Sequence, residues 1–252
     1  ISRFYETEFS NVGRSVHTLA VKATNKFEET RDIVKSYINA KHREEIIFTK
    51  GATEAINLVA NTYGEKFIKA GDEIIVTELE HHSNYVPWHY LREKKGAVIK
   101  FASVNDNGEV DINEFKKQIS DKTKMIAFTH ISNVTGTIMP VKKIVDLAKT
   151  KNIPVLIDGT QGAPHSILDV QDLDCDFYAI SCHKMYGPNG LGILYAKKKW
   201  VDELPPYQGG GGMISEVKKN EISYADSPTK FEAGTMQTAE VVAFAKSIKF
   251  IQ

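Results

Sequence analysis

The chain has 252 residues, 42% hydrophobic and 25% charged, a composition typical of a globular protein. Basic and acidic residues balance at 32 each, so charge favours neither nucleic acid nor an anionic membrane as a partner. No apolar run reaches the ~20 residues that span a bilayer. The two cysteines, Cys175 and Cys182, are too few for a disulfide framework and lack metal-ligand spacing, so we expect a cytoplasmic protein.

Predicted helices and strands alternate through most of the chain. Periodic apolar residues predict helices, and these cover residues 18–38, 54–67, 111–119 and 141–149, with another through Trp88 and Leu91. Short apolar runs predict strands over residues 45–48, 72–77, 97–104, 125–129, 153–157, 177–180 and 191–195. The helix at 54–67 is expected to take Thr53 as its N-cap. This alternation predicts an α/β fold, a mostly parallel sheet with helices on both faces.

The pattern loosens after Trp200. Four glycines at positions 209–212 predict a flexible loop, and a helix resumes near Ala239 and still continues at Gln252. We therefore expect one domain over residues 1–238, with its opening segment incomplete. Residues 239–252 are expected to start a helix that leads into a C-terminal domain outside this sequence.

Polar residues cluster where the predicted strands end. Ligands of an open parallel sheet lie at the carboxyl ends of its strands, so these residues are candidates for one site. The clusters are Gly51-Ala52-Thr53, His81-His82, Asn133, Asp158 with Gln161, and Ser181-Cys182-His183-Lys184.

Each cluster alone has a plainer interpretation. Thr53 can be only a helix cap, and Asn133 only a turn residue. Asp158 either caps the segment that follows it or pairs with a buried cation, and Gln161 can be a surface amide. A lysine such as Lys184 is more often solvated than catalytic, although a place just after a buried strand can desolvate it and lower its pKa.

One cofactor accounts for all five clusters. Pyridoxal phosphate needs a lysine for its aldehyde, an anion cradle, a carboxylate at its pyridine nitrogen and a planar group on its ring. The residues that meet these needs are Lys184 for the Schiff base, Asp158 for the nitrogen, His81 for the ring, and Ala52, Thr53, Ser181 and His183 for the phosphate. Asn133 and Gln161 remain as donors to the ring oxygen or to the substrate.

These motifs resemble the class V aminotransferase family of fold-type I pyridoxal-phosphate enzymes, and within it the SUF-type cysteine desulfurases. The matching stretches are GATEAINLVA at Gly51, ELEHHSNYVPW at Glu78, THISNVTGT at Thr129, VLIDGTQ at Val155, DCDFYAISCHKMYGPNGLGILY at Asp174 and FEAGT at Phe231. The resemblance implies the large domain of an aspartate aminotransferase-like, pyridoxal-phosphate-dependent transferase.

The resemblance also implies roles for single residues. Lys184 is the Schiff-base lysine, His81 stacks on the ring and handles protons, Asp158 meets the pyridine nitrogen and Gln161 the ring hydroxyl. Asn133 lies near the substrate, and the phosphate is contacted by Thr53, Ser181 and His183. Thr235 would reach the phosphate of a neighbouring subunit, which implies a homodimer.

The implied activity is that of a cysteine desulfurase. Such an enzyme takes sulfur from L-cysteine, releases L-alanine and carries a persulfide, which a sulfur-acceptor protein of the SUF system receives for iron–sulfur cluster assembly. In this family the sulfur-accepting cysteine and the arginine that binds the substrate carboxylate lie beyond the position of Gln252. We therefore expect this segment alone to be inactive in sulfur transfer. Cys182, which stands where many relatives carry glycine, is not expected to be the nucleophile.

Three alternatives stay open. The cofactor could serve another substrate, as in selenocysteine lyase or kynureninase-like chemistry. The domain could bind pyridoxal phosphate without turnover. The third alternative is a metal protein built on His81, His82 and Glu80, although these residues lack the H-E-x-x-H register of a helical zinc site.

Overall fold

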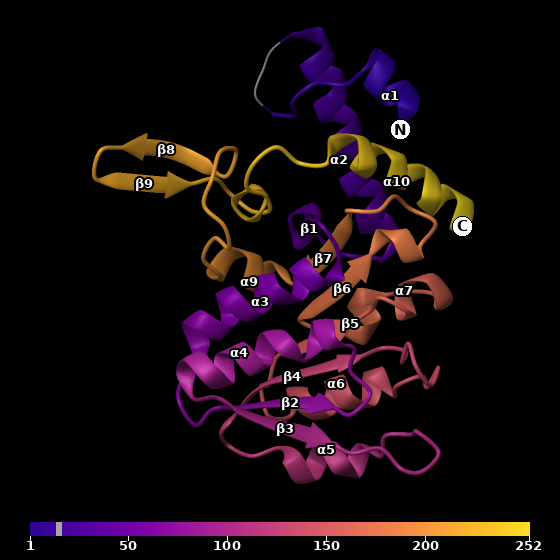
Figure 1. Ribbon diagram of the computed structural model, residues 1–252, viewed down its shortest axis with the longest axis vertical. Coiled ribbons are helices and arrows are strands. Elements are labelled where there is room, and N and C mark those ends of the chain that lie inside the picture. Colours follow the sequence, from indigo (N-terminus) through magenta and orange to yellow (C-terminus); the bar gives the residue numbers. More distant parts are fainter. Residues whose placement is uncertain (14–16) are drawn as a thin grey trace.

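The computed structural model describes residues 1–13 and 17–252, which build a sheet flanked by helices (Figure 1). Its strands follow the order β1-β7-β6-β5-β4-β2-β3. They are β1 (Ile46–Thr49), β2 (Glu73–Thr77), β3 (Val98–Ala102), β4 (Thr123–Thr129), β5 (Val155–Asp158), β6 (Phe177–Ser181) and β7 (Gly192–Ala196). All neighbouring pairs are parallel except those of β7, which runs antiparallel to both β1 and β6. The predicted α/β class and mostly parallel sheet are confirmed.

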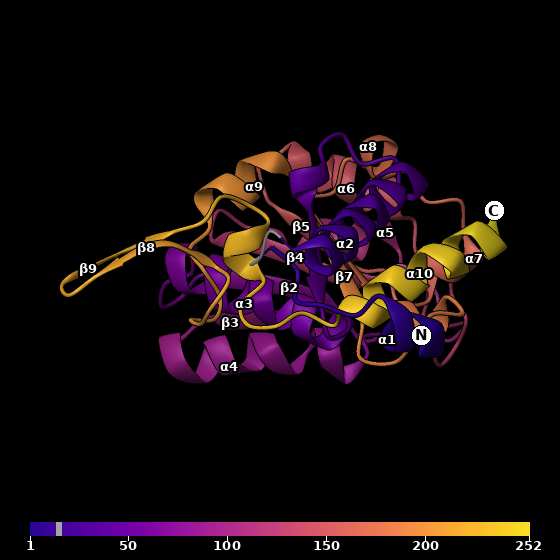
Figure 2. The same ribbon diagram turned by 90° about the horizontal axis from the view of Figure 1, so that it is seen from above.

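Helices cover both faces of the sheet, as expected. Figure 2 shows α4 on one side and α6 and α8 on the other. The cluster that contains Met125 and Ala127 of β4 packs against α3 (Ala52–Phe67), α4 (Val86–Lys95) and α9 (Lys198–Glu203). The other cluster, with Ile126 and Phe128, packs against α2 (Thr18–Tyr37), α5 (Ile112–Gln118), α6 (Val141–Lys149), α8 (Val170–Leu173) and α10 (Thr238–Ile251). Strands buried on both faces become continuous apolar runs in the sequence, which is why they were predictable.

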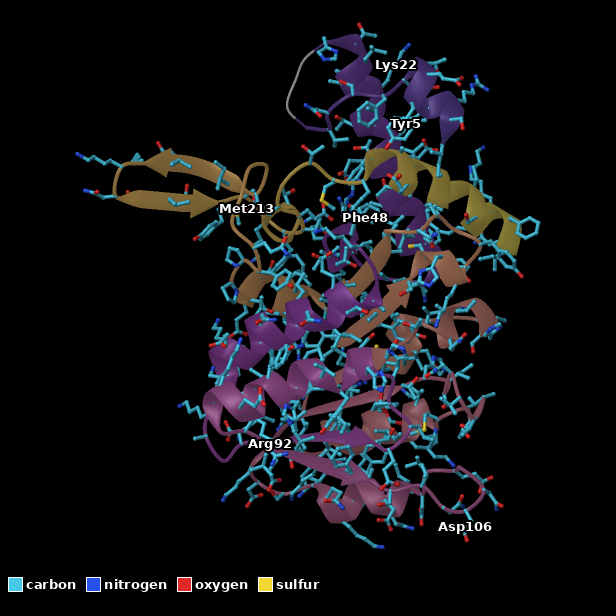
Figure 3. All side chains as sticks on the ribbon, viewed as in Figure 1. Tyr5, Lys22, Phe48, Arg92, Asp106 and Met213 are labelled. Atoms are coloured by element: carbon cyan, nitrogen blue, oxygen red, sulfur yellow. The ribbon has the colours of Figure 1, made fainter. Side chains whose placement is uncertain are left out.

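The ends of the described chain lie together beside the sheet. Phe4 of α1 (Ser2–Thr7) packs with Ala23 of α2 and Ala239 of α10, and Figure 1 shows these three helices grouped at one end of the molecule. Phe48 of β1 lies in the interior beneath them (Figure 3). The helix expected from Ala239 onward is confirmed as α10. None of the helices in the described residues is long and apolar enough to cross a membrane.

The structure differs from the prediction after the glycine run. Strands β8 (Ile214–Lys218) and β9 (Glu221–Tyr224) form an antiparallel hairpin that projects from the body (Figures 1 and 2). Every residue of both strands is exposed, whereas Met213 is buried at the base of the hairpin (Figure 3). Because neither face is buried, these strands lack the apolar alternation from which strands are recognised.

Candidate active site

A cavity of about 300 Å³ opens at the carboxyl ends of the parallel strands, within the usual size range of small-molecule sites. It collects every predicted cofactor-binding residue except Thr235. The lining residues are Ala52, Thr53, His81, Ser83, Thr129, Ile131, Asn133, Asp158, Thr160, Gln161, Ser181, His183 and Lys184. Five polar segments between residues 52 and 184 thus meet in one place, as the strand-end argument predicts.

The start of α3 forms the anion-binding corner of the cavity. Ala52 N donates to Ser181 Oγ at 3.0 Å, so the first turn of α3 meets the end of β6. A Cβ atom on Gly192 of β7 would lie 2.3 Å from Gly51 Cα, so this close approach of two backbones requires glycine. Free amides and the positive end of the helix dipole favour a phosphate here.

The prediction that Thr53 is the N-cap of α3 is wrong. Gly51 occupies the N-cap position and makes no side-chain capping bond, while Thr53 lies inside the helix. Its hydroxyl lies 2.8 Å from Ser83 Oγ. Thr53 therefore faces the cavity and joins α3 to the segment that carries His81.

The His81 ring is oriented by Ser83. His81 Nδ1 accepts from Ser83 N at 3.1 Å and lies 2.9 Å from Ser83 Oγ. Since Nδ1 accepts, a neutral imidazole carries its proton on Nε2. His82 does not line the cavity; its ring centre lies 5.7 Å from that of His81.

Asp158 ends β5 and is buried, with 4% of its surface exposed. Its Oδ1 accepts from Thr160 N at 3.0 Å, so the carboxylate caps the following turn while it also lines the cavity. The capping interpretation of Asp158 is therefore confirmed, and its pairing with a cation stays a prediction. The turn leads to Gln161, which lies on the same cavity wall.

A buried histidine–tyrosine pair supports this turn. His130 Nδ1 lies 2.7 Å from Tyr178 Oη, and burial lowers the pKa of His130. A Cβ on Gly159 would lie 1.8 Å from the Tyr178 ring, and one on Gly162 would lie 2.4 Å from His130 Nδ1. The two glycines let the turn rest directly on the pair, a role that only the tertiary contacts reveal.

A 3₁₀ turn (Cys182–Lys184) follows β6 directly. Lys184 is the last residue of this turn and lines the cavity. Its side chain is exposed, and so is that of His183. Its position after a buried strand therefore leaves the lysine side chain exposed and accessible to a ligand. Burial raises the pKa of the neighbouring Cys182 thiol well above its ordinary value, which agrees with its exclusion as a nucleophile.

The loop after β4 brings in Asn133. Ser132 N donates to Thr137 O at 3.0 Å, and an antiparallel bridge joins Ile131 to Ile138. The loop is thus closed on itself, with Ile131 and Asn133 on the cavity wall.

Glu80 is a half-buried acid that the sequence analysis mentioned only as a metal ligand. It accepts hydrogen bonds from Thr77, Asn84 and Thr129, and burial raises its pKa to about 8. Among residues 1–13 and 17–252, no group of three or more histidine, cysteine or acidic residues could hold a metal ion. Glu80 is engaged in the fold instead.

Thr235 is the one predicted residue that lies elsewhere. It is exposed and borders a separate cavity between α2 and residues 229–236. Close by, Glu232 forms a buried pair with Arg31, with Nη1–Oε1 and Nη2–Oε2 distances of 2.8 and 2.9 Å. Within one chain Thr235 does not reach the other site residues. Its contact with the phosphate of a second subunit stays a prediction.

The Aminotransferase class-V family model matches residues 1–252. The chain belongs to the class V aminotransferase family. This membership confirms the expected family of pyridoxal-phosphate enzymes. The residues around the cavity fit that cofactor, because they supply an amine, a buried carboxylate, an imidazole and an anion-binding helix terminus.

Among the similar proteins is a cysteine desulfurase of Pectobacterium atrosepticum, 45% identical over 251 residues, which are 99% of this chain and 62% of that protein. A solved cysteine desulfurase of Thermococcus onnurineus NA1 is 37% identical with a TM-score of 0.95, over 99% of this chain and 62% of that one. One from Escherichia coli is 36% identical with a TM-score of 0.92, over 99% and 63%. The chain thus spans less than two thirds of the length of these relatives, and their fold is the predicted fold-type I.

Proposed function

We propose that the protein is a pyridoxal-phosphate-dependent cysteine desulfurase, which converts L-cysteine to L-alanine and passes the sulfur to an enzyme cysteine as a persulfide. The observation that carries the proposal is the single cavity in which Lys184, Asp158 and His81 meet the amino end of α3. The similarity to cysteine desulfurases supports the choice of substrate.

The predicted site residues that line the cavity have proposed roles in binding the cofactor or the substrate or in moving protons. When bound, pyridoxal phosphate supplies an electron sink for charge that develops on the substrate. The first amides of α3, with Ser181 and His183, would hold its phosphate, and the Asp158 carboxylate would hold a proton at its pyridine nitrogen. His81 would contact the ring and handle protons, Gln161 would bind the ring hydroxyl, and Asn133 would orient the substrate. The Lys184 amine would bind the aldehyde and serve as the proton-transfer group.

The persulfide is proposed on a cysteine other than the two in this sequence. Cys175 and Cys182 are both buried and free, and burial raises the pKa of Cys175 to about 12. A buried, protonated thiol is a poor nucleophile. We propose that the nucleophile, and the arginine that binds the substrate carboxylate, follow the position of Gln252, as the family resemblance implies.

The biological setting is proposed from the same resemblance. We propose a cytoplasmic homodimer in which Thr235 of each subunit contacts the phosphate of the other. A SUF-type acceptor would receive the sulfur for iron–sulfur cluster assembly. Thr235 is exposed and lies outside the candidate active site of its own chain, which is consistent with a contact to the cofactor of a second subunit.

The test is made on the complete protein. Addition of pyridoxal phosphate should give an absorbance band near ~420 nm, the usual region for a lysine-bound form of this cofactor, and L-cysteine should yield alanine. Lys184→Ala should abolish the borohydride-reducible link between protein and cofactor. Cofactor binding without alanine release from cysteine would contradict the proposed activity, and faster turnover of selenocysteine would reassign the substrate.

A further inference from the structure

Glu80 lies at the point where the segment carrying His81 leaves β2. Its Oε1 accepts from Thr77 Oγ1 at 2.5 Å and from Thr129 N at 3.0 Å, and its Oε2 accepts from Asn84 Nδ2 at 2.6 Å. These donors come from the end of β2, the end of β4 and the 3₁₀ turn His82–Asn84. One carboxylate therefore ties three structural elements together, and one of its donors, Thr129, lines the cavity.

The network continues into the core of the molecule. Asn84 Oδ1 accepts from Trp88 Nε1 at 3.1 Å, and both Asn84 and Trp88 are fully buried. Asn84 N also donates to His81 O at 2.8 Å. The backbone carbonyl of His81 is thus held by Asn84, and the Glu80 carboxylate fixes the Asn84 side chain.

We propose that Glu80 is the positioning residue that sets the His81 imidazole over the cofactor cavity. The inference rests on the proposed function insofar as His81 acts on the cofactor. Glu80 itself does not line the cavity, so it acts through the segment 80–84. Its two acceptor oxygens serve three donors, and an apolar side chain in its place would leave Thr129 N and Asn84 Nδ2 without this partner.

The electrostatics agree with a rigid, enclosed carboxyl group. Burial raises the pKa of Glu80 to about 8 although three hydrogen bonds act in the opposite direction, and the charge of Asp158 on β5 adds to the increase. The donors from β2, β4 and the 3₁₀ turn are uncharged. A neutral carboxyl group can still keep the network, because its proton can be donated to Thr77 Oγ1.

The test compares Glu80→Gln and Glu80→Ala in the complete protein loaded with pyridoxal phosphate. The amide has one acceptor oxygen, so Glu80→Gln loses the bond to Asn84 or to Thr129, whereas Glu80→Ala loses all three. Visible circular dichroism per bound cofactor, which reports the asymmetry of the ring's surroundings, should fall modestly in the first variant and by at least about half in the second. The value of kcat should fall by about tenfold in Glu80→Gln and on the order of 100-fold in Glu80→Ala, as for a displaced catalytic group. Glu78→Gln, an exposed acid on the same segment, is the control and should change neither.

A double-mutant cycle separates positioning from general stabilisation. If Glu80 acts through His81, Glu80→Ala should cause little further loss of dichroism or kcat in a His81→Ala background. Equal losses in both backgrounds would overturn the proposal.

Amide hydrogen exchange gives a readout that does not depend on the cofactor. In protein without pyridoxal phosphate, Glu80→Ala should speed exchange of the peptide covering residues 81–85 by at least about tenfold, since the local bonds open more often. Unchanged exchange there would overturn the positioning role. If instead the wild-type protein fails to take up pyridoxal phosphate, the proposed function fails while exchange still decides the role of Glu80.

Discussion

At the scale of single residues, the two adjacent histidines differ sharply in their surroundings. His81 lines the cavity and has its ring fixed by Ser83, whereas His82 lies outside the cavity. Their chemistry is identical, so only position can separate their effects. They form a matched pair for testing which imidazole serves the reaction.

We predict that His81→Ala in the complete protein lowers kcat for alanine formation by 10²–10⁴-fold, the usual contribution, roughly, of a general acid–base group. His82→Ala should leave kcat within about twofold, because a surface substitution away from the site changes little. Steady-state alanine release measures both. Comparable losses in the two variants would mean that the segment, and not the His81 ring, carries the effect.

The raised pKa of Glu80 predicts how stability depends on pH. Between the ordinary glutamate pKa of 4.5 and the folded-state pKa of about 8, the folded protein holds a proton that the unfolded chain releases. The unfolding free energy therefore falls as pH rises through this window, by at most about 1.4 kcal/mol per pH unit from this group. Below pH 4.5 and above pH 8 this contribution to the slope disappears.

Glu80→Gln removes this titration. Urea unfolding of cofactor-free protein at pH 5.5, 6.5 and 7.5 should show wild type losing stability relative to the variant as pH rises. Taking the difference between the two proteins cancels the other titrating groups. Parallel curves would show that Glu80 is ionised throughout this range.

At the scale of elements, the approach of β7 to the start of α3 builds the anion-binding corner. A methyl group on Gly192 would collide with Gly51 backbone atoms between 2.3 and 2.7 Å away, and backbone cannot swing aside as a flexible side chain can. Both strand β7 and the first turn of α3 would have to move apart. The bond between Ala52 N and Ser181 Oγ lies directly beside this contact.

We predict that Gly192→Ala destabilises the fold by about 1–3 kcal/mol, the usual cost of overpacking, and weakens cofactor binding because the phosphate corner opens. Gly209→Ala is the control: a Cβ there meets nothing within 4 Å, so stability should stay within about 0.5 kcal/mol. Thermal unfolding and cofactor titration give the two readouts. A variant with normal stability and affinity would show that the corner tolerates displacement.

At the scale of the whole molecule, sequence patterns predicted what depends on burial and on strand order. Residues 125–129 and 177–180 are apolar on both faces because helices cover both sides of the sheet, so these strands were identifiable. The strand-end rule then brought Asp158, His81 and Lys184 together. The remaining features depend on contacts between distant segments. Glu80 and Tyr178 acquire their roles only when β4 lies between β2 and β5. The hairpin of β8 and β9 has no buried face, so its sequence carries no apolar alternation that would predict strands.

A buried ion pair joins α2 to the segment that precedes α10. Arg31 of α2 and Glu232 lie 201 positions apart and pair through the two terminal guanidinium nitrogens, and Glu232 Oε1 also accepts from Phe48 N of β1 at 2.8 Å. The guanidinium lies over the Phe48 ring at 4.6 Å. This pair fixes the segment that carries Thr235 to the body of the molecule.

Loss of the buried partner of such a pair leaves a buried charge with less compensation. We predict that Glu232→Ala lowers the unfolding free energy by about 3 kcal/mol, the low end of the usual cost, since Arg31 stays buried and charged but keeps its half-exposed partner Glu28. Glu203→Ala, which removes an exposed partner of Lys66, should cost no more than about 1 kcal/mol. Urea midpoints of the complete protein compare the two. Similar midpoints for the two variants would show that the Arg31 pair contributes no more than a surface pair. If Thr235 contacts the cofactor of the neighbouring subunit, Glu232→Ala should also speed cofactor loss, whereas Glu203→Ala should not.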